Sequence, residues 1–393
     1  MTGRHVSPLP MSSLNLPVYL DYHATTPVDA RVFEAMTPYF MEVFGNPASS
    51  GHPFGLKARA AVESSRRLLA ECLHAAPQEV VFTSGASESN NLAIKGAVKL
   101  CGAKSGHIVT AATEHKAVLN ACKSLEAEGY VLTVLQVDPD GHIPLEAIRS
   151  ALRDDTVLVS LMHANNEIGV VHDIAAIGAL CREHGVLLHT DATQSIGKVP
   201  FDVRTLNADL ISMSGHKMYG PKGVGALYVR KPCRIAPLID GGGHEGGLRS
   251  GTLNVPGIVG LAKAVELATT LADDDIAHAR RLRDRIWQAL STTFPQLLLN
   301  GPALPSDAAG RLPNNLNVSL PPPAGEALLE AFGSVAVSTS SACTSAAGEA
   351  SHVLTAIGRA AGLVNLRISV GRQTTDTEID YVVACIQRAA VVA

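Results

Sequence analysis

This sequence has no cysteine pair with metal-binding spacing. Its seven cysteines are scattered along 393 residues without a C-x-x-C pattern, at Cys72, Cys101, Cys122, Cys181, Cys233, Cys343 and Cys385. That scatter argues against a zinc site and against a disulfide framework. An odd number of free thiols fits a reducing compartment, so we expect a cytoplasmic protein that holds no metal.

Long apolar runs and a strong charge of one sign are missing as well. No stretch approaches about 18 continuous apolar residues, so we expect neither a membrane span nor a membrane partner. Residues 1–17 lack the apolar core of a signal peptide, and we expect them to form a flexible N-terminal tail. The formal net charge is only -4, which argues against nucleic acid as a partner.

What is present is an alternation of apolar runs and helical patterns. The apolar runs are continuous rather than alternating, as buried parallel strands require. The helical segments between them predict βαβ units, and hence an α/β fold with a mostly parallel seven-stranded sheet and helices on both faces. The expected strands are residues 79–83, 107–111, 131–137, 157–162, 186–190, 210–213 and 224–229.

The pattern changes in the last third of the chain. A long helix is expected over 256–290, and a smaller α+β domain follows it, with a break at the three prolines 321–323. We therefore expect a large domain over 18–270 and a small C-terminal domain over 271–393. Residues 18–27 are candidates to pack with the small domain.

A lysine and an acid at two strand ends are the first candidate site residues. Lys217 follows the apolar run 210–213 in a Ser-Gly-His-Lys turn, and Asp191 ends the run 186–190. A lysine and a carboxylate are the two groups that a pyridoxal 5'-phosphate (PLP) site requires. The lysine forms a Schiff base with the cofactor, and the acid keeps the pyridine nitrogen protonated so that the ring can accept electrons.

Three further strand ends carry polar groups, each with a plainer alternative. Ser84-Gly85-Ala86-Ser87 precedes a helix and predicts a phosphate cradle, although a plain helix cap would use the same residues. His115 lies where ligands bind in open α/β sheets, but it could simply cap a helix. Asn165-Asn166 suits a hydrogen bond to a cofactor oxygen, or merely a turn.

Two candidates lie in the C-terminal part. Arg367 is a charge inside a strand pattern, so it needs a buried partner: a substrate carboxylate, or a structural acid. Cys343 lies in a long run of small polar residues, 338–348, that predicts a mobile loop. Such a thiol is a candidate nucleophile, with an incidental cysteine as the alternative.

Taken together, these segments resemble the cysteine desulfurases, the NifS/IscS-like branch of the fold-type I PLP enzymes in the class V aminotransferase family. The resemblance runs from Tyr19 to about Tyr381. Its blocks, in order, are residues 20–27 (LDYHATTP), 82–89 (FTSGASES), 113–115 (TEH), 165–169 (NNEIG), 191–195 (DATQS), 214–217 (SGHK), 249–252 (RSGT) and 341–345 (SACTS).

The resemblance implies a cofactor-binding role for most of these residues. Lys217 would carry the PLP, Asp191 would pair with its pyridine nitrogen, and His115 would stack on the ring and serve as a catalytic acid or base. The phenolic oxygen would contact Asn166 and Gln194. The phosphate would be held by Ala86, Ser87, Ser214 and His216, with Thr252 reaching in from the second subunit of a homodimer.

The resemblance also implies the reaction and its partners. Arg367, helped by Asn166, would bind the carboxylate of L-cysteine, and Cys343 would take the sulfur as a persulfide. The sulfur would pass to an acceptor protein, such as an iron–sulfur scaffold or a sulfur relay protein, for iron–sulfur cluster or thio-cofactor and tRNA biosynthesis. Selenocysteine lyase is the nearest alternative, and a PLP aminotransferase is a more distant one.

Overall fold

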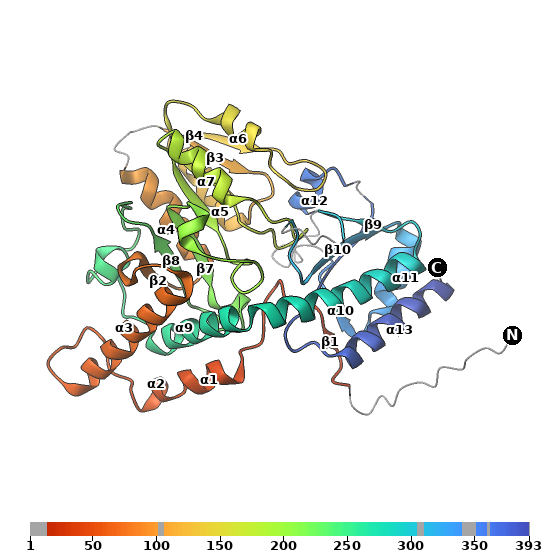
Figure 1. The fold of residues 1–393 in the computed structure, drawn as a ribbon, viewed down its shortest axis with the longest axis horizontal. Coiled ribbons are helices and arrows are strands. Elements are labelled where there is room, and N and C mark those ends of the chain that lie inside the picture. Colours follow the sequence, from red (N-terminus) through yellow and green to blue (C-terminus); the bar gives the residue numbers. More distant parts are fainter. Residues whose placement is uncertain (1–13, 101–105, 305–309, 340–350, 360–361, 393) are drawn as a thin grey trace.

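The computed structural model describes residues 14–100, 106–304, 310–339, 351–359 and 362–392 (Figure 1). Its main feature is a seven-stranded sheet in the order β2-β8-β7-β6-β5-β3-β4. Neighbouring strands are parallel except β8, which is antiparallel to both β2 and β7. The predicted α/β class and seven-stranded sheet are confirmed. The strands are β2 (Val80–Thr83), β3 (His107–Ala111), β4 (Val131–Leu135), β5 (Thr156–Ser160), β6 (Leu187–Asp191), β7 (Leu210–Ser214) and β8 (Gly225–Val229).

Helices cover both faces of this sheet because consecutive strand residues point to opposite sides. Phe82 belongs to one core with α1, α3, α6, α7, α8 and α9, whereas its neighbour Val81 belongs to a second core with α4 and α5. The first set comprises α1 (Ala30–Met36), α3 (Pro53–Leu73), α6 (Leu145–Ala151), α7 (Ile174–Glu183), α8 (Val203–Leu206) and α9 (Val255–Thr270); the second, α4 (Ala86–Leu100) and α5 (Lys116–Ala127).

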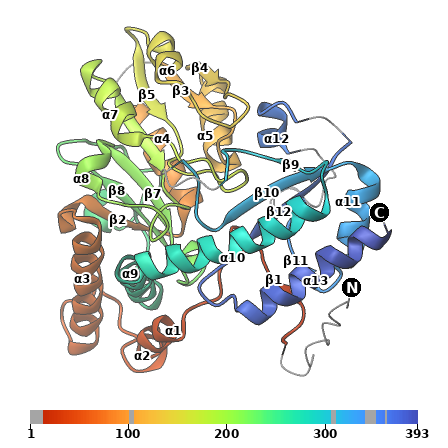
Figure 2. The same cartoon turned by 45° about the vertical axis from the view of Figure 1, so that its right-hand side comes forward.

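A separate core is built mainly from the C-terminal part. Its three-stranded sheet has the order β12-β10-β9, and Figure 2 shows α10 and α13 side by side against it. The elements are α10 (Ala272–Thr293), β9 (Leu298–Leu299), β10 (Asn315–Leu320), α11 (Pro322–Ala331), β11 (Val335–Ala336), α12 (His352–Ala356), β12 (Val364–Ser369) and α13 (Asp376–Val392).

The start of the described chain joins this C-terminal core. Strand β1 (Val18–Tyr19) pairs in parallel with β11, and the side chains of Val18 and Leu20 are buried in the same core as α10 and α13. The chain therefore crosses between the two cores early, before α1 begins. The predicted boundary at residue 270 stays a prediction, and most of the predicted tail lies outside the described residues.

Two expectations for the last third of the chain differ from the structure. The helix expected over 256–290 is two helices, α9 and α10, bent by 72° at the break between them. The prolines at 321–323 were expected to form a break, but Pro321 caps α11 and Pro322 is its first residue. A proline suits the first helical position because its φ is already helical and because an N–H there would have no partner.

The remaining helix is α2 (Pro38–Met41), which Pro38 separates from α1. Among the described residues, no individual helix combines the length and apolar character that crossing a membrane needs, although the bent pair α9–α10 passes that test of length and composition as a pair.

Candidate active site

The carboxyl ends of the central strands open onto a cavity of about 330 Å³. This is where ligands bind in open α/β sheets, and the volume suits a small cofactor. Most of the sequence-predicted site residues line it, although they come from segments far apart in the chain: Ala86, Ser87, His115, Asn166, Asp191, Gln194, Ser214, His216, Lys217 and Arg367.

Two predicted residues are not among those that the structure places at this cavity. Thr252 is exposed and does not line the cavity of its own chain. Cys343 lies outside the described residues. The assignment of Thr252 to a partner's site and of Cys343 to sulfur chemistry therefore stays a prediction.

Asp191 is held at the end of β6 by two donors. Its Oδ1 accepts from the Thr193 backbone N–H at 2.9 Å, and its Oδ2 accepts from Asn90 Nδ2 at 2.8 Å. Asn90 comes from the buried side of α4. These two contacts fix the orientation of the carboxylate at one end of the cavity.

Lys217 ends the short 3-10 turn Gly215–Lys217 that follows β7. Its Nζ donates to the backbone carbonyls of His23 at 2.6 Å and Ala24 at 2.8 Å. The neighbouring His216 contacts Thr25 Oγ1 through Nδ1 at 3.1 Å. Burial, helped by the positive charge of Lys217, lowers the pKa of His216 to about 4, so this ring is neutral at pH 7.

A second lysine lies beside the first, and the sequence reading missed it. Lys198 Nζ donates to Gln194 Oε1 and to the Lys217 carbonyl, both at 3.2 Å. Burial, followed by the charge of Lys217, lowers the pKa of Lys198 to about 7. Gln194 Nε2 donates to the His23 carbonyl at 3.0 Å, so these contacts fix which end of the Gln194 amide is the donor.

The turn between β2 and α4 has the features of an anion site. The first-turn N–H groups of a 15-residue helix have no acceptor within the helix, and the helix dipole favours negative charge there. Gly85 has φ +146° and lies 3.7 Å, measured from an added Cβ, from Ser214 Oγ. Ser214 therefore lies next to the turn, as the predicted phosphate cradle requires.

Both alternatives for His115, capping a helix and lying at the ligand-binding edge of the sheet, hold in the structure. It is the N-cap of α5, where its Nδ1 accepts from the Ala117 backbone N–H at 3.1 Å, and it also lines the cavity. Because Nδ1 is an acceptor, the proton of the neutral ring is on Nε2. The capping contact thus determines which ring nitrogen can donate.

The two alternatives for Asn165-Asn166, a turn or a contact with a cofactor oxygen, apply to different residues of the pair. Asn165 is buried and builds the turn, since its Oδ1 accepts from the backbone N–H groups of Glu167 and Ile168 at 2.8 and 2.9 Å. Asn166 lines the cavity. Only the second of the two is therefore placed to meet a ligand.

Arg367 pairs with a structural acid, which was the alternative to a substrate carboxylate. Its Nη2 is 2.8 Å from Asp21 Oδ1 and 2.9 Å from Ser338 Oγ, and its Nη1 donates to the Asn166 carbonyl at 3.3 Å. Its buried Nε has no partner among the described residues. Arg367 thus lines the cavity with one guanidinium donor that the described residues leave unsatisfied.

The residues present fit PLP. An amine, a carboxylate fixed by two donors and a helix N-terminus surround one cavity, and buried polar atoms without partners among the described residues lie at its wall, such as Arg367 Nε and His23 Nε2. The sequence reading missed His23 and Ala24 as contacts of Lys217. Among the sequence features, only the block 20–27 pointed to these two residues. Their side chains gave no indication, because Lys217 contacts their backbone carbonyls from a distant segment of the chain.

Comparison with known proteins identifies the family. The model of the family "Aminotransferase class-V" matches residues 18–382. The chain is 52% identical over 374 residues to a cysteine desulfurase IscS of Anaeromyxobacter dehalogenans (strain 2CP-C), covering 94% of this chain and 91% of the relative. It is 49% identical over 380 residues to a cysteine desulfurase IscS of Rickettsia rickettsii (strain Iowa), covering 96% and 92%.

Solved structures give the same result. A NifS-like protein superimposes with a TM-score of 0.86 at 38% identity, covering 94% of this chain and 98% of the other. The structure described as SspA in complex with cysteine superimposes with a TM-score of 0.80 at 38% identity, covering 91% of this chain and all of the other.

Proposed function

This chain belongs to the class-V aminotransferase family and is a PLP-dependent cysteine desulfurase, and we propose that the cavity around Lys217 is its active site. The observation that carries the assignment is that Lys217 and Asp191, from the ends of neighbouring strands, line one cavity beside a helix N-terminus. Its substrate is L-cysteine, and its amino-acid product is L-alanine.

The proposed roles follow from charge and geometry. PLP, when bound through Lys217 and paired with Asp191, would withdraw electrons from the substrate Cα. Once the substrate amine has displaced Lys217 from the cofactor, Lys217 Nζ would accept the α-proton, and His115 would donate or accept protons through Nε2. Arg367, helped by Asn166, would bind the substrate carboxylate, since both line the cavity.

The sulfur transfer is proposed to use Cys343. Its thiolate would attack the substrate sulfur, so that a sulfur–sulfur bond forms as the carbon–sulfur bond breaks. The electron pair of the broken bond stays on carbon, which is then protonated to give alanine, and the enzyme keeps a Cys343 persulfide. We propose that this sulfur passes to an acceptor protein for iron–sulfur cluster or thio-cofactor and tRNA synthesis.

The sulfur assignment is tested with two cysteine variants. Wild-type protein with L-cysteine and a reductant should release alanine and sulfide, and Cys343→Ala should lose this activity while keeping the visible absorbance of bound PLP. Cys233→Ala, which changes a thiol away from the cavity, should stay near wild type. A Cys343→Ala enzyme with full activity on L-cysteine would contradict the mechanism, and retained activity on selenocysteine alone would indicate a selenocysteine lyase.

We further propose that the working form is a homodimer. An exposed apolar surface on α1, α2, the segment after α2 and the start of α3 supports this, because monomers rarely leave such patches uncovered. Its residues are Phe33, Phe40, Met41, Phe44 and Phe54. The Arg66–Glu245 ion pair, 2.7 Å long, ties the segment before Thr252 to α3.

Mixed dimers test the position of Thr252. Co-expressed Lys217→Ala and Thr252→Ala chains would form one intact site only if Thr252 serves the partner's cavity. The mixture should then bind PLP and form alanine better than either variant alone. An activity no higher than that of the Thr252→Ala variant would place Thr252 in the site of its own chain, or outside both.

A cytoplasmic location is likewise a proposal. It rests on cysteine usage: the five described cysteines form no disulfide with one another. Cell fractionation with an antibody against the chain would test it.

A further inference from the structure

Residues 23–29, here called the strap, follow the Lys217 turn along its length. The Thr26 backbone N–H donates to the His216 carbonyl at 2.9 Å, and the Asp29 N–H donates to the Tyr219 carbonyl at 2.9 Å. In return, the Tyr219 N–H donates to Thr26 Oγ1 at 2.8 Å. Because the same strap supplies the two carbonyls that Lys217 Nζ contacts, its position decides where Nζ lies.

Tyr219 is the strained point of this arrangement. Its φ is +62°, a left-handed conformation that a residue with a side chain keeps only when its surroundings hold it. Its hydroxyl accepts from the Arg372 backbone N–H at 2.6 Å, and the Arg372 guanidinium lies 4.5 Å from the centre of its ring. Arg372 therefore contacts this side chain twice, once through its backbone N–H and once through its guanidinium, and the Tyr22 ring lies 6.3 Å away.

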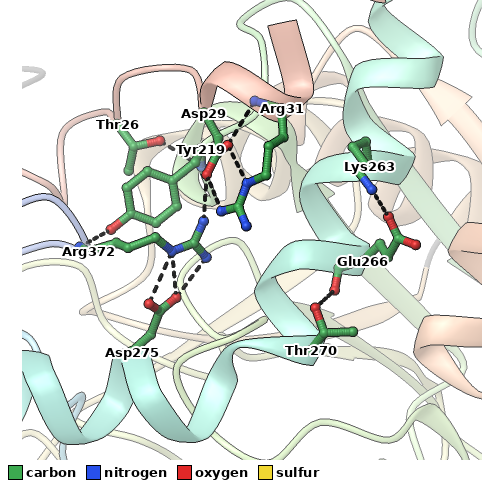
Figure 3. A network of polar contacts seen from close by, with 9 residues as sticks. All are labelled: Thr26, Asp29, Arg31, Tyr219, Lys263, Glu266, Thr270, Asp275 and Arg372. Carbon is green, nitrogen blue, oxygen red and sulfur yellow. Dashed lines mark hydrogen bonds and ion pairs between the residues drawn. The ribbon is translucent and has the colours of Figure 1, made fainter. Parts of the chain in front are cut away.

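Arg372 connects three segments of the chain (Figure 3). Its Nη1 donates to Asp29 Oδ2 at 3.0 Å, which fastens the end of the strap. Its Nε and Nη2 both contact Asp275 Oδ2, at 2.9 and 2.7 Å, which fastens the strap to α10. Arg372 itself follows β12, the strand that carries Arg367.

An exposed ion pair of this kind would contribute little. This one is different, since the Arg372 side chain is only 15% exposed and uses its planar fork on two carboxylates at once. A lysine has no such fork and cannot reproduce the contacts. The Lys263–Glu266 pair on α9, also drawn in Figure 3, touches neither the strap nor the Lys217 turn and provides a matched comparison.

We propose that Arg372 is a positioning residue for the desulfurase reaction, which holds Tyr219 and the strap and thereby places Lys217 Nζ in the cavity. This inference rests on the proposed role of Lys217. It implies that Arg372 acts without touching substrate or cofactor, through a clamp formed with Asp29, Asp275 and Tyr219.

The test compares Arg372→Met, Arg372→Lys and Asp275→Asn holoenzymes with wild type and with the control Glu266→Gln. Bound PLP per chain and the thermal midpoint are measured first. Alanine formation then gives kcat and KM for L-cysteine, and stopped-flow absorbance gives the rate at which the visible PLP band changes on mixing with L-cysteine. That rate reports how readily Lys217 is displaced, which a purely structural contact would not alter.

Arg372→Met is expected to lower kcat and the stopped-flow rate by about tenfold or more, with KM changed by less than about threefold. Arg372→Lys should recover little, and Asp275→Asn should show a smaller loss of the same kind. Rates per PLP-bound chain equal to wild type in Arg372→Met would overturn the inference. If that variant does not fold, Asp275→Asn decides in the same way, and an inactive, colourless wild type would instead refute the proposed function.

Discussion

At the scale of single residues, the site works by fixing the orientation of groups that would otherwise be free to rotate. The Asp191 carboxylate is held by Asn90 and the Thr193 amide, and the Gln194 amide is held by Lys198 and the His23 carbonyl. Such contacts orient a side chain before a ligand arrives, and two of the residues that make them, Asn90 and Lys198, do not line the cavity. The chemistry therefore depends on residues that never touch the substrate.

The substitution Asp191→Asn removes the charge of this side chain and keeps its shape. The amide has nearly the same size but cannot keep the cofactor nitrogen protonated, so we expect kcat for alanine formation to fall at least about 100-fold. The thermal midpoint should change little. Asp155→Asn, which breaks an exposed ion pair with Arg153, is the control and should keep wild-type kcat. A kcat for Asp191→Asn within about twofold of wild type would place the essential acid elsewhere.

At the scale of elements, the backbones of β7, β8 and the turn at Gly85 pack closely together. This packing places that turn, the predicted phosphate cradle, beside the cavity. Gly225 begins β8, and a Cβ there would lie 2.7 Å from Gly85 Cα and also collide with the Met213 carbonyl. The antiparallel strand β8 can lie between β2 and β7 at this point only because residue 225 has no side chain.

Gly225→Ala should therefore push the turn at Gly85 out of place. We expect a loss of about 1–3 kcal/mol in the free energy of unfolding, together with weaker PLP binding. Urea unfolding and PLP titration measure the two effects. Gly51→Ala, whose Cβ would meet nothing within 4 Å and whose φ lies outside the left-handed region, is the control and should keep wild-type stability and PLP affinity. Unchanged PLP affinity in Gly225→Ala would show that the turn tolerates the shift.

At the scale of the whole molecule, buried neutral histidines make stability depend on pH. Burial lowers the pKa of His163 to about 4, of His172 to about 3 and of His189 to about 4. In the unfolded chain a histidine has a pKa of about 6.5. The unfolded state therefore binds more protons, and the stability from these rings is complete above about pH 6.5 and is lost as pH falls towards 4.

Each of these rings should contribute about 2 kcal/mol of lost stability between pH 7 and pH 5. Urea unfolding at a series of pH values measures this dependence. Replacing His172 by Asn should make the curve shallower, because one proton-binding group disappears from the unfolded chain. Replacing the exposed His184 by Asn should leave its slope unchanged. Equal slopes for the His172 variant and wild type would assign the acid sensitivity to other groups.

Much of the fold and site could be predicted from local patterns. The apolar runs at 107–111 and 210–213 became strands because buried parallel strands need continuous apolar sequence. The polar residues after these runs met in one cavity because parallel strands end at the same edge. Pro322 was misread, since a proline can start a helix as well as stop one.

By itself, the sequence determined the class of fold, the strands and the chemical groups of the site, because those depend on residue type and on spacing along a few turns of chain. Only the tertiary structure decided which partners those groups have. The carbonyls of His23 and Ala24 at Lys217, Asp21 at Arg367, and the two aspartates at Arg372 come from segments that are distant in sequence. Contacts of that kind depend on how separate elements pack, and no local pattern encodes them.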